Sequence, residues 1–146
     1  MKFVYDNGGR DKYFKKEIVG DCVTRAIANA TGKDYKEVYD AINKLAKQER
    51  PSVRRSRVSN ARNGVYRISY EKYLNSLGWY FVPTMSIGSG CQVHLREDEL
   101  PSGTIICRLS RHLTCVKDGV IYDTYDCSRN GTRCVYGYFV KEKVGE

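Results

Sequence analysis

The amino-acid sequence predicts neither a membrane-spanning segment nor a segment that directs secretion. None of its apolar runs approaches the roughly 20 residues that a membrane-spanning helix needs. The N-terminal stretch MKFVYDNGGRDKYFKK also lacks the apolar core of a secretory signal peptide. We therefore expect a cytoplasmic protein that has no membrane partner.

Metal-binding patterns are also missing. The chain has only two histidines, His94 and His112, and its six cysteines form no Cys-x2-Cys pair. Because structural zinc sites usually combine such pairs with further cysteines or histidines, we expect no metal and no other cofactor. In a reducing cytosol the cysteines should be mostly free thiols. Cys127 and Cys134 flank an Asn-Gly turn and could bridge across a hairpin, but the reduced state is favoured.

Size and composition indicate one globular domain. The chain has 146 residues, of which 41% are hydrophobic, so residues 1–146 can bury a single core. The net charge of +8 would attract acidic partners without specifying one, and no feature specifies an oligomeric state. Residues 1–20 show no sustained periodicity and are expected to form an arm laid over the domain.

A basic segment over residues 52–64 is the strongest local charge feature. Its arginines are Arg54, Arg55, Arg57 and Arg62. A solvated loop is the favoured interpretation, and a mobile flap beside a cleft or a phosphate-binding loop are alternatives. Because no aromatic platform or nucleic-acid motif accompanies the arginines, the sequence does not favour nucleic acid as a partner.

The first half of the chain has helical patterns. In GDCVTRAIANATG, Asp21 is a suitable N-cap residue, apolar residues recur at helical spacing, and Gly32 ends the run. A second helix should start at Asp34, with Glu37 completing a capping box, and should end before Pro51. A third is expected in ISYEKYLNSLGW, with Ser69 as its cap and Gly78 as its stop.

Strand patterns dominate the second half. Alternating or β-branched runs predict strands at 79–83, 104–109, 112–117, 120–125 and 135–140, with an uncertain piece at 92–95. Asp118-Gly119 is a strong hairpin signal. Helices followed by an antiparallel sheet indicate an α+β fold.

Three residues form a candidate catalytic group. Cys22 falls in the first turn of its predicted helix, where unpaired N–H groups and the helix dipole favour a thiolate. If Lys117 pairs with Val120 across the hairpin, Asp123 lies diagonal to His112, within side-chain reach on the same sheet face. A thiol, an imidazole and a carboxylate in this order form the generalised nucleophilic triad.

The motifs GDCVTRAIA and RHLTCVKDGVIYDTYD resemble the papain-like cysteine peptidase superfamily. The resemblance is to its bacteriocin-processing and transglutaminase-like branches, and to uncharacterised papain-like proteins of bacteria and their viruses. It implies a papain-like α+β fold, with Cys22 as nucleophile, His112 as general base and Asp123 as the orienting acid. The implied function is hydrolysis or transfer at an acyl or peptide bond, with a peptide or protein as substrate.

The chain departs from that family pattern at the oxyanion hole. Papain-like peptidases use a glutamine a few residues before the cysteine, and the stretch KKEIVGD has none. The backbone N–H of Cys22 can still donate, and Asp21 or Asn7 are candidates for the second group.

Each of the three residues also has a structural interpretation. Cys22 could be a core cysteine, His112 an ordinary strand histidine, and Asp126 competes with Asp123 as the orienting acid. An inactive papain-like module that binds a protein partner is the first alternative function. A nucleic-acid-binding protein that uses the basic 52–64 loop is the second.

Overall fold

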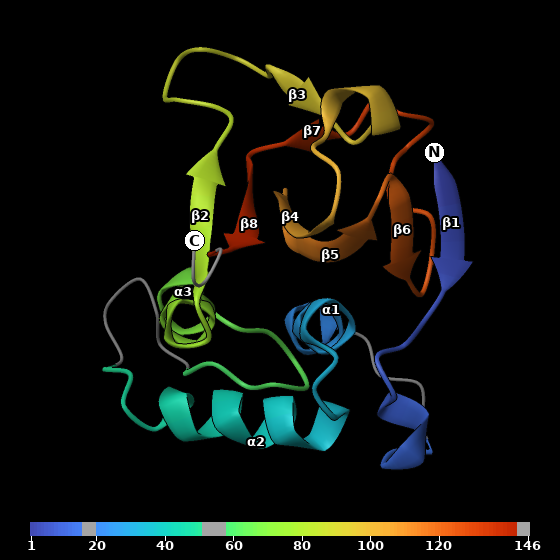
Figure 1. The fold of residues 1–146 in the computed structure, drawn as a ribbon. Helices are drawn as coiled ribbons and strands as arrows, with labels where there is room; N and C mark the ends of the chain where they lie inside the picture. The colour runs from blue at the N-terminus through green and yellow to red at the C-terminus, as the bar shows by residue number, and fades with distance from the viewer. Residues whose placement is uncertain (16–19, 51–57, 143–146) are drawn as a thin grey trace.

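The computed structural model describes residues 1–15, 20–50 and 58–142, and it is a mixed α and β structure. A six-stranded sheet has the strand order β1-β6-β5-β4-β8-β2. Figure 1 shows α1, α2 and α3 on one side of this sheet and the short β3-β7 ribbon on the other. No helix in the described ranges is long and apolar enough to span a membrane.

The sheet consists of β1 (Lys2–Tyr5), β2 (Trp79–Pro83), β4 (Thr104–Leu109), β5 (His112–Lys117), β6 (Val120–Asp123) and β8 (Gly137–Lys141). The Asp118-Gly119 turn joins β5 and β6 with Lys117 paired to Val120, which is the predicted register. The strand predicted at 120–125 ends earlier, at Asp123. The run predicted at 135–140 is divided between β7 (Cys134–Val135) and β8.

The N-terminal residues differ from the expected arm. β1 pairs with β6 in parallel, so the sheet is mixed and not purely antiparallel as predicted. The strand lies at the sheet edge with its side chains exposed, which explains why its sequence carries no clear alternation. The 3-10 helix η1 (Arg10–Lys12) follows, and its Arg10 is buried.

Three helices cover one face of the sheet. They are α1 (Cys22–Thr31), α2 (Tyr35–Ala46) and α3 (Arg67–Ser76), close to the predicted positions. Asp34 occupies the predicted N-cap position of α2, but its carboxylate accepts a hydrogen bond from the Tyr13 hydroxyl at 2.6 Å and makes no capping hydrogen bond. The cap prediction for Ser69 is wrong, because Ser69 lies inside α3.

Two apolar cores lie on opposite faces of the sheet. α1 packs on β5, and its Ile27 lies with Leu113 and Phe139 in the core beneath the helices. On the other face, Leu95 and Val116 belong to a second core, which the segment with β3 (Val93–His94) and the 3-10 helix η2 (Glu97–Glu99) covers. Both faces of the central strands are therefore buried.

The cysteine prediction needs correction. Cys134 forms a disulfide with Cys91, and Cys127 is a free, buried thiol. The bond links the connection before β3 to β7, which are neighbours in the small antiparallel ribbon. Pairing of these distant segments could not be seen from cysteine spacing, which brought only the hairpin pair Cys127 and Cys134 into consideration. Cys22, Cys107 and Cys115 are free.

Candidate active site

Cys22 is the first residue of α1 and lines a cavity of about 440 Å³. The helix begins here because Asp21 occupies the N-cap position and the following residues Val23, Ala26 and Ile27 bury one face on the sheet. His112, the first residue of β5, lines the same cavity. The packing of α1 on β5 therefore brings the thiol and the imidazole together from residues 90 positions apart.

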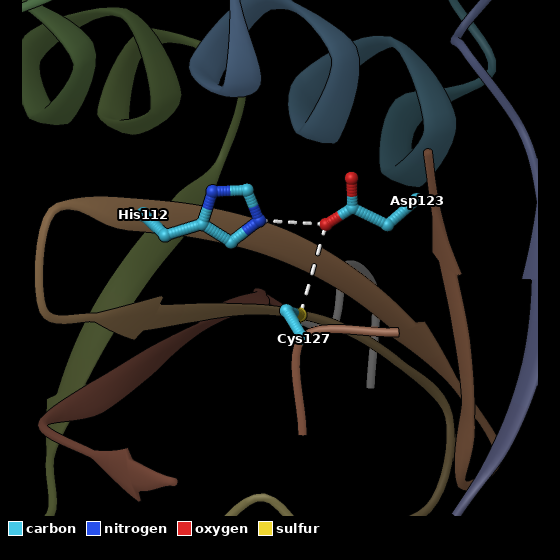
Figure 2. Close-up of side chains that lie close together, drawn as sticks. All are labelled: His112, Asp123 and Cys127. Atoms are coloured by element: carbon cyan, nitrogen blue, oxygen red, sulfur yellow. Dashed lines mark hydrogen bonds and ion pairs between the residues drawn. The ribbon is translucent and has the colours of Figure 1, made fainter. Parts of the chain in front are cut away.

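Asp123 holds the imidazole of His112 by a short contact. His112 Nε2 lies 2.7 Å from Asp123 Oδ2, and Figure 2 shows the ring directed at that carboxylate oxygen. Both side chains are almost fully buried, with 7% and 3% exposure. Because Nε2 is engaged by Asp123, the other ring nitrogen, Nδ1, is the one left to receive a proton from Cys22.

Further groups fix the carboxylate of Asp123. The Thr114 hydroxyl donates to Oδ2 at 2.7 Å and the Thr124 backbone N–H donates to Oδ1 at 2.7 Å. Arg25 of α1 contacts Oδ1 at 3.3 Å. An ionised carboxylate buried among this many donors is a rigid acceptor for the histidine.

The site residues have shifted pKa values. Burial opposes ionisation of the Cys22 thiol, but the hydrogen bond and positive charge of His112, the Leu113 backbone N–H and the Arg25 charge together lower its pKa. Burial likewise disfavours the His112 cation, but hydrogen bonds to Asp123, Cys127 and Cys22 raise its pKa to about 12. Together these shifts favour a thiolate–imidazolium pair.

The pKa of Asp123 is lowered, which favours the charged carboxylate. Burial alone would raise the pKa, but the His112 hydrogen bond and charge, with the Thr114 and Thr124 donors, lower it. Asp123 therefore stays an acceptor at neutral pH.

The competing acid Asp126 is directed elsewhere. Its Oδ1 accepts hydrogen bonds from the backbone N–H and the hydroxyl of Ser128, at 3.0 and 2.7 Å. These bonds lower the pKa of the Asp126 carboxyl and form a local turn. Of the two acids considered from the sequence, Asp123 is the one that contacts His112.

Asp21 is not an oxyanion donor and does not cap α1 through its side chain. The carboxylate is 1% exposed and accepts hydrogen bonds from Arg25, from Arg10 at 3.2 Å and from the Tyr35 hydroxyl at 2.8 Å. Its oxygens face these donors and act as acceptors. Its role is to fix α1 to η1 and α2, which places Cys22 indirectly.

Asn7 is likewise committed to a turn. Its side-chain oxygen accepts a hydrogen bond from the Gly9 backbone N–H at 3.1 Å, and Asn7 does not line the cavity that contains Cys22. Asn63 does line that cavity, and among the described lining residues it alone carries a side-chain amide. The backbone carbonyl of Asn63 lies against Gly20, 2.8 Å from where a Cβ would stand, so the two segments meet beside the thiol.

The basic segment contributes little to the described site. Arg54, Arg55 and Arg57 lie outside the described residues, and the Arg62 guanidinium lies 5.1 Å from the centre of the Phe14 ring.

One group of potential metal ligands overlaps the site. His112, Asp123 and Cys127 offer ligand atoms within 4.8 Å of one another. Figure 2 shows Cys127 approaching the same Asp123 oxygen as His112, with Sγ 3.7 Å from Oδ2. However, Thr114 and the cationic Arg25 already bind this carboxylate, and a positive neighbour disfavours a metal cation. The arrangement therefore fits a hydrogen-bonded His–Asp pair better than a metal centre.

Several supporting residues were not singled out from the sequence. Arg25 and Cys127 reach the site from α1 and the segment after β6, and the Tyr125 ring lies 5.3 Å from the His112 ring. Only Thr114 had a usable signal, because the alternation of β5 predicts that it shares a face with His112.

Comparisons of the chain with known protein families, curated proteins and solved structures found no match. The interpretation of the site therefore depends on its geometry and chemistry.

Proposed function

We propose that this protein is a thiol hydrolase or acyltransferase of papain-like type, in which Cys22, His112 and Asp123 form the catalytic triad. The supporting observation is the 2.7 Å contact between His112 Nε2 and Asp123 Oδ2, which fixes the imidazole. His112 and Cys22 line the same cavity. Such an arrangement serves nucleophilic attack on an acyl or peptide carbonyl. A peptide or protein is the substrate class we favour.

The reaction would begin with transfer of the thiol proton from Cys22 to His112 Nδ1. The thiolate then attacks the substrate carbonyl carbon, and the imidazolium returns its proton to the leaving amine as the C–N bond breaks. Water, activated by neutral His112, hydrolyses the thioester and regenerates the thiol. An amine in place of water would make the enzyme an acyltransferase. Asp123 keeps the ring oriented and stabilises its cation throughout.

The oxyanion would be stabilised at the start of α1. The backbone N–H of Cys22 belongs to the first turn, where helical N–H groups have no partner within the helix. A second donor is needed, and the side-chain amide of Asn63 is the candidate because it lines the same cavity. This assignment replaces Asp21 and Asn7, whose side chains are bound elsewhere.

Site-resolved alkylation tests the activated thiol. Native protein is treated with iodoacetamide between pH 5 and 9, and each cysteine is quantified by mass spectrometry. We expect fast modification of Cys22 already at pH 6 because its pKa is lowered, mainly by His112 acting against burial. His112→Ala should slow the reaction at pH 6 by at least about tenfold, since one pKa unit corresponds to a tenfold change in thiolate.

A matched pair of variants tests the orienting acid. Asp123→Asn should slow Cys22 alkylation at pH 6, whereas Asp126→Asn, an equally conservative change at the other acid, should leave the rate unchanged. Acylation is then followed with p-nitrophenyl acetate, which should acetylate Cys22 in the native protein and release nitrophenolate. Two results together would reject the catalytic function and favour the binding module. Cys22 would react slowly, only above pH 8 and no faster than other exposed cysteines, and p-nitrophenyl acetate would not acetylate it.

A further inference from the structure

The cavity beside Cys22 is strongly basic. Its wall includes Arg67, Arg108 and Arg111, and none of the described residues that line it is an aspartate or glutamate. His112, which tends to carry a charge, lies in the same wall. A site of this composition attracts anions and repels cations, and the effect is largest where low-dielectric walls focus the field.

Among the three arginines, Arg108 has the most firmly fixed side chain. It belongs to β4 and lies on the helix-facing side of that strand with Ile106, which packs in the core beneath the helices. Its guanidinium lies 5.8 Å from the centre of the Tyr136 ring, and it lines the same cavity as Tyr70. The contact with Tyr136 holds the cation at a defined place on the cavity wall.

No carboxylate of the described residues pairs with Arg108. Across residues 1–15, 20–50 and 58–142, no acidic side chain forms an ion pair with it. The side chain is only partly exposed, so its charge is incompletely solvated. A half-buried guanidinium beside the Tyr136 ring presents N–H donors in the planar geometry that suits a carboxylate.

The other two arginines contribute less. Arg67, at the start of α3, lies 4.9 Å from the Phe81 ring and pairs with Glu71 at 3.3 Å, which offsets its charge. Arg111 occupies the turn between β4 and β5 with a positive φ of 54° and is exposed. Neither combines a fixed position with an unpaired charge as Arg108 does.

We propose that the substrate carries a carboxylate close to the scissile acyl group and that Arg108 binds it. This inference rests on the proposed function, because it assigns a substrate class to the same thiol. Arg108 lines the same cavity as Cys22 and His112, and it pairs with Leu113, the residue after His112, across the β4–β5 ladder. A carboxylate bound by Arg108 would therefore share this cavity with the reacting carbonyl. The cavity of about 440 Å³ accommodates an acidic residue with its neighbouring peptide groups.

Two alkylating reagents of nearly equal size separate the charge effect from the thiol reactivity. Iodoacetate carries a carboxylate and iodoacetamide is neutral, and both react with the thiolate of Cys22. The ratio of their second-order rates, iodoacetate over iodoacetamide, reports the anion preference at Cys22. We expect this ratio to exceed that of free cysteine.

Variants then assign the preference to Arg108. Arg108→Gln should lower the ratio about fivefold, the factor of a single charge pair in a solvent-filled cavity. Arg108→Lys retains the charge and should keep most of the ratio, which also covers the case in which the glutamine variant fails to fold. Arg96→Gln removes the same charge from the residue that precedes η2, outside the cavity, and should leave the ratio unchanged.

The outcomes distinguish the two proposals. Fast iodoacetamide modification of Cys22 with a ratio that Arg108→Gln does not change would overturn the carboxylate site and leave the thiol function intact. Slow iodoacetamide modification would reject the proposed function itself.

Protection experiments identify the source of the carboxylate. Acetyl-glutamate amide carries a side-chain carboxylate, acetyl-glycine carries a terminal one, and acetyl-glutamine amide is neutral. Slower iodoacetamide modification with the first compound assigns an acidic side chain, and slower modification with the second assigns a free C-terminus. Equal protection by all three, or by none, would contradict recognition by charge.

Discussion

Arg25 Nη2 lies 3.3 Å from Asp123 Oδ1, so the helix that begins with Cys22 is tied directly to the acid that orients His112. The same guanidinium binds Asp21, and both carboxylates are buried. Burial opposes the charge of Arg25, but the two aspartates raise its pKa. One side chain therefore links the nucleophile's helix to the sheet.

Replacement of Arg25 should be costly for this reason. Arg25→Met would leave two buried carboxylates short of a cation, and we expect a loss of about 3 to 5 kcal/mol in the free energy of unfolding. Arg25→Lys should lose less because it keeps the charge. Urea denaturation followed by circular dichroism measures both values.

Arg10→Met provides the comparison, since Arg10 contacts Asp21 and not Asp123. It should destabilise the protein but leave Cys22 alkylation at pH 6 close to native, whereas Arg25→Met should slow it. Equal alkylation rates in the two variants would show that the link between α1 and Asp123 does not position the thiol.

The His112–Asp123 pair predicts a pH-dependent stability. The pKa of His112 is about 12 in the folded protein, above its unfolded value near 6.5. A raised pKa contributes stability that is complete below pH 6 and is lost as the pH rises from about 6.5 towards 12. The lowered pKa of Asp123 contributes stability above about pH 4, and this stability is lost as acid protonates the carboxylate.

Thiolate formation at Cys22 has the opposite sign, because a lowered thiol pKa adds stability as the pH rises. The measurement is therefore made in Cys22→Ala and compared with Cys22→Ala/His112→Gln. The difference in unfolding free energy between the two should shrink from pH 6 to pH 9. A difference that is constant over this range would mean that the pKa of His112 is the same in the folded and unfolded protein, and would contradict the raised pKa.

The Cys91–Cys134 disulfide should stabilise the chain because it closes a loop across a sequence separation of 43 residues. Reduction with a phosphine should lower the free energy of unfolding by about 2 to 4 kcal/mol. Cys134→Ser should show the same lower value with and without the reductant. Native protein in which Cys91 and Cys134 both alkylate without reduction would contradict this pairing.

The central hairpin could be predicted because its information is local. Asp118-Gly119 specifies a tight turn, and the observed register follows from it together with the diagonal placement of His112 and Asp123. The helix start at Cys22 followed from the apolar spacing after Asp21 in the same way. Short stretches of sequence therefore predict the secondary structure near the site.

Long-range relationships could not be predicted in the same way. The parallel pairing of β1 with β6 and the Cys91–Cys134 bond join segments whose contact has no local signal. Asp21 was interpreted as a cap from its position alone, whereas its environment is set by Arg10 and Tyr35 from two other elements. Where a residue type suits several roles, its neighbours in space decide which role it takes.

The position of β1 has a consequence for the order of folding. Lys2 pairs with Val120, and the Asp6 backbone N–H donates to the Asp123 carbonyl at 2.8 Å. Of the strand pairings in the described residues, this one spans the greatest sequence separation, so its loop closure costs the most entropy and is expected late. The end of β6 that carries Asp123 gains its hydrogen bonds to β1 only after the N-terminal strand has paired with β6. A growing polypeptide would thus carry Cys22 for most of its synthesis without an activated thiol.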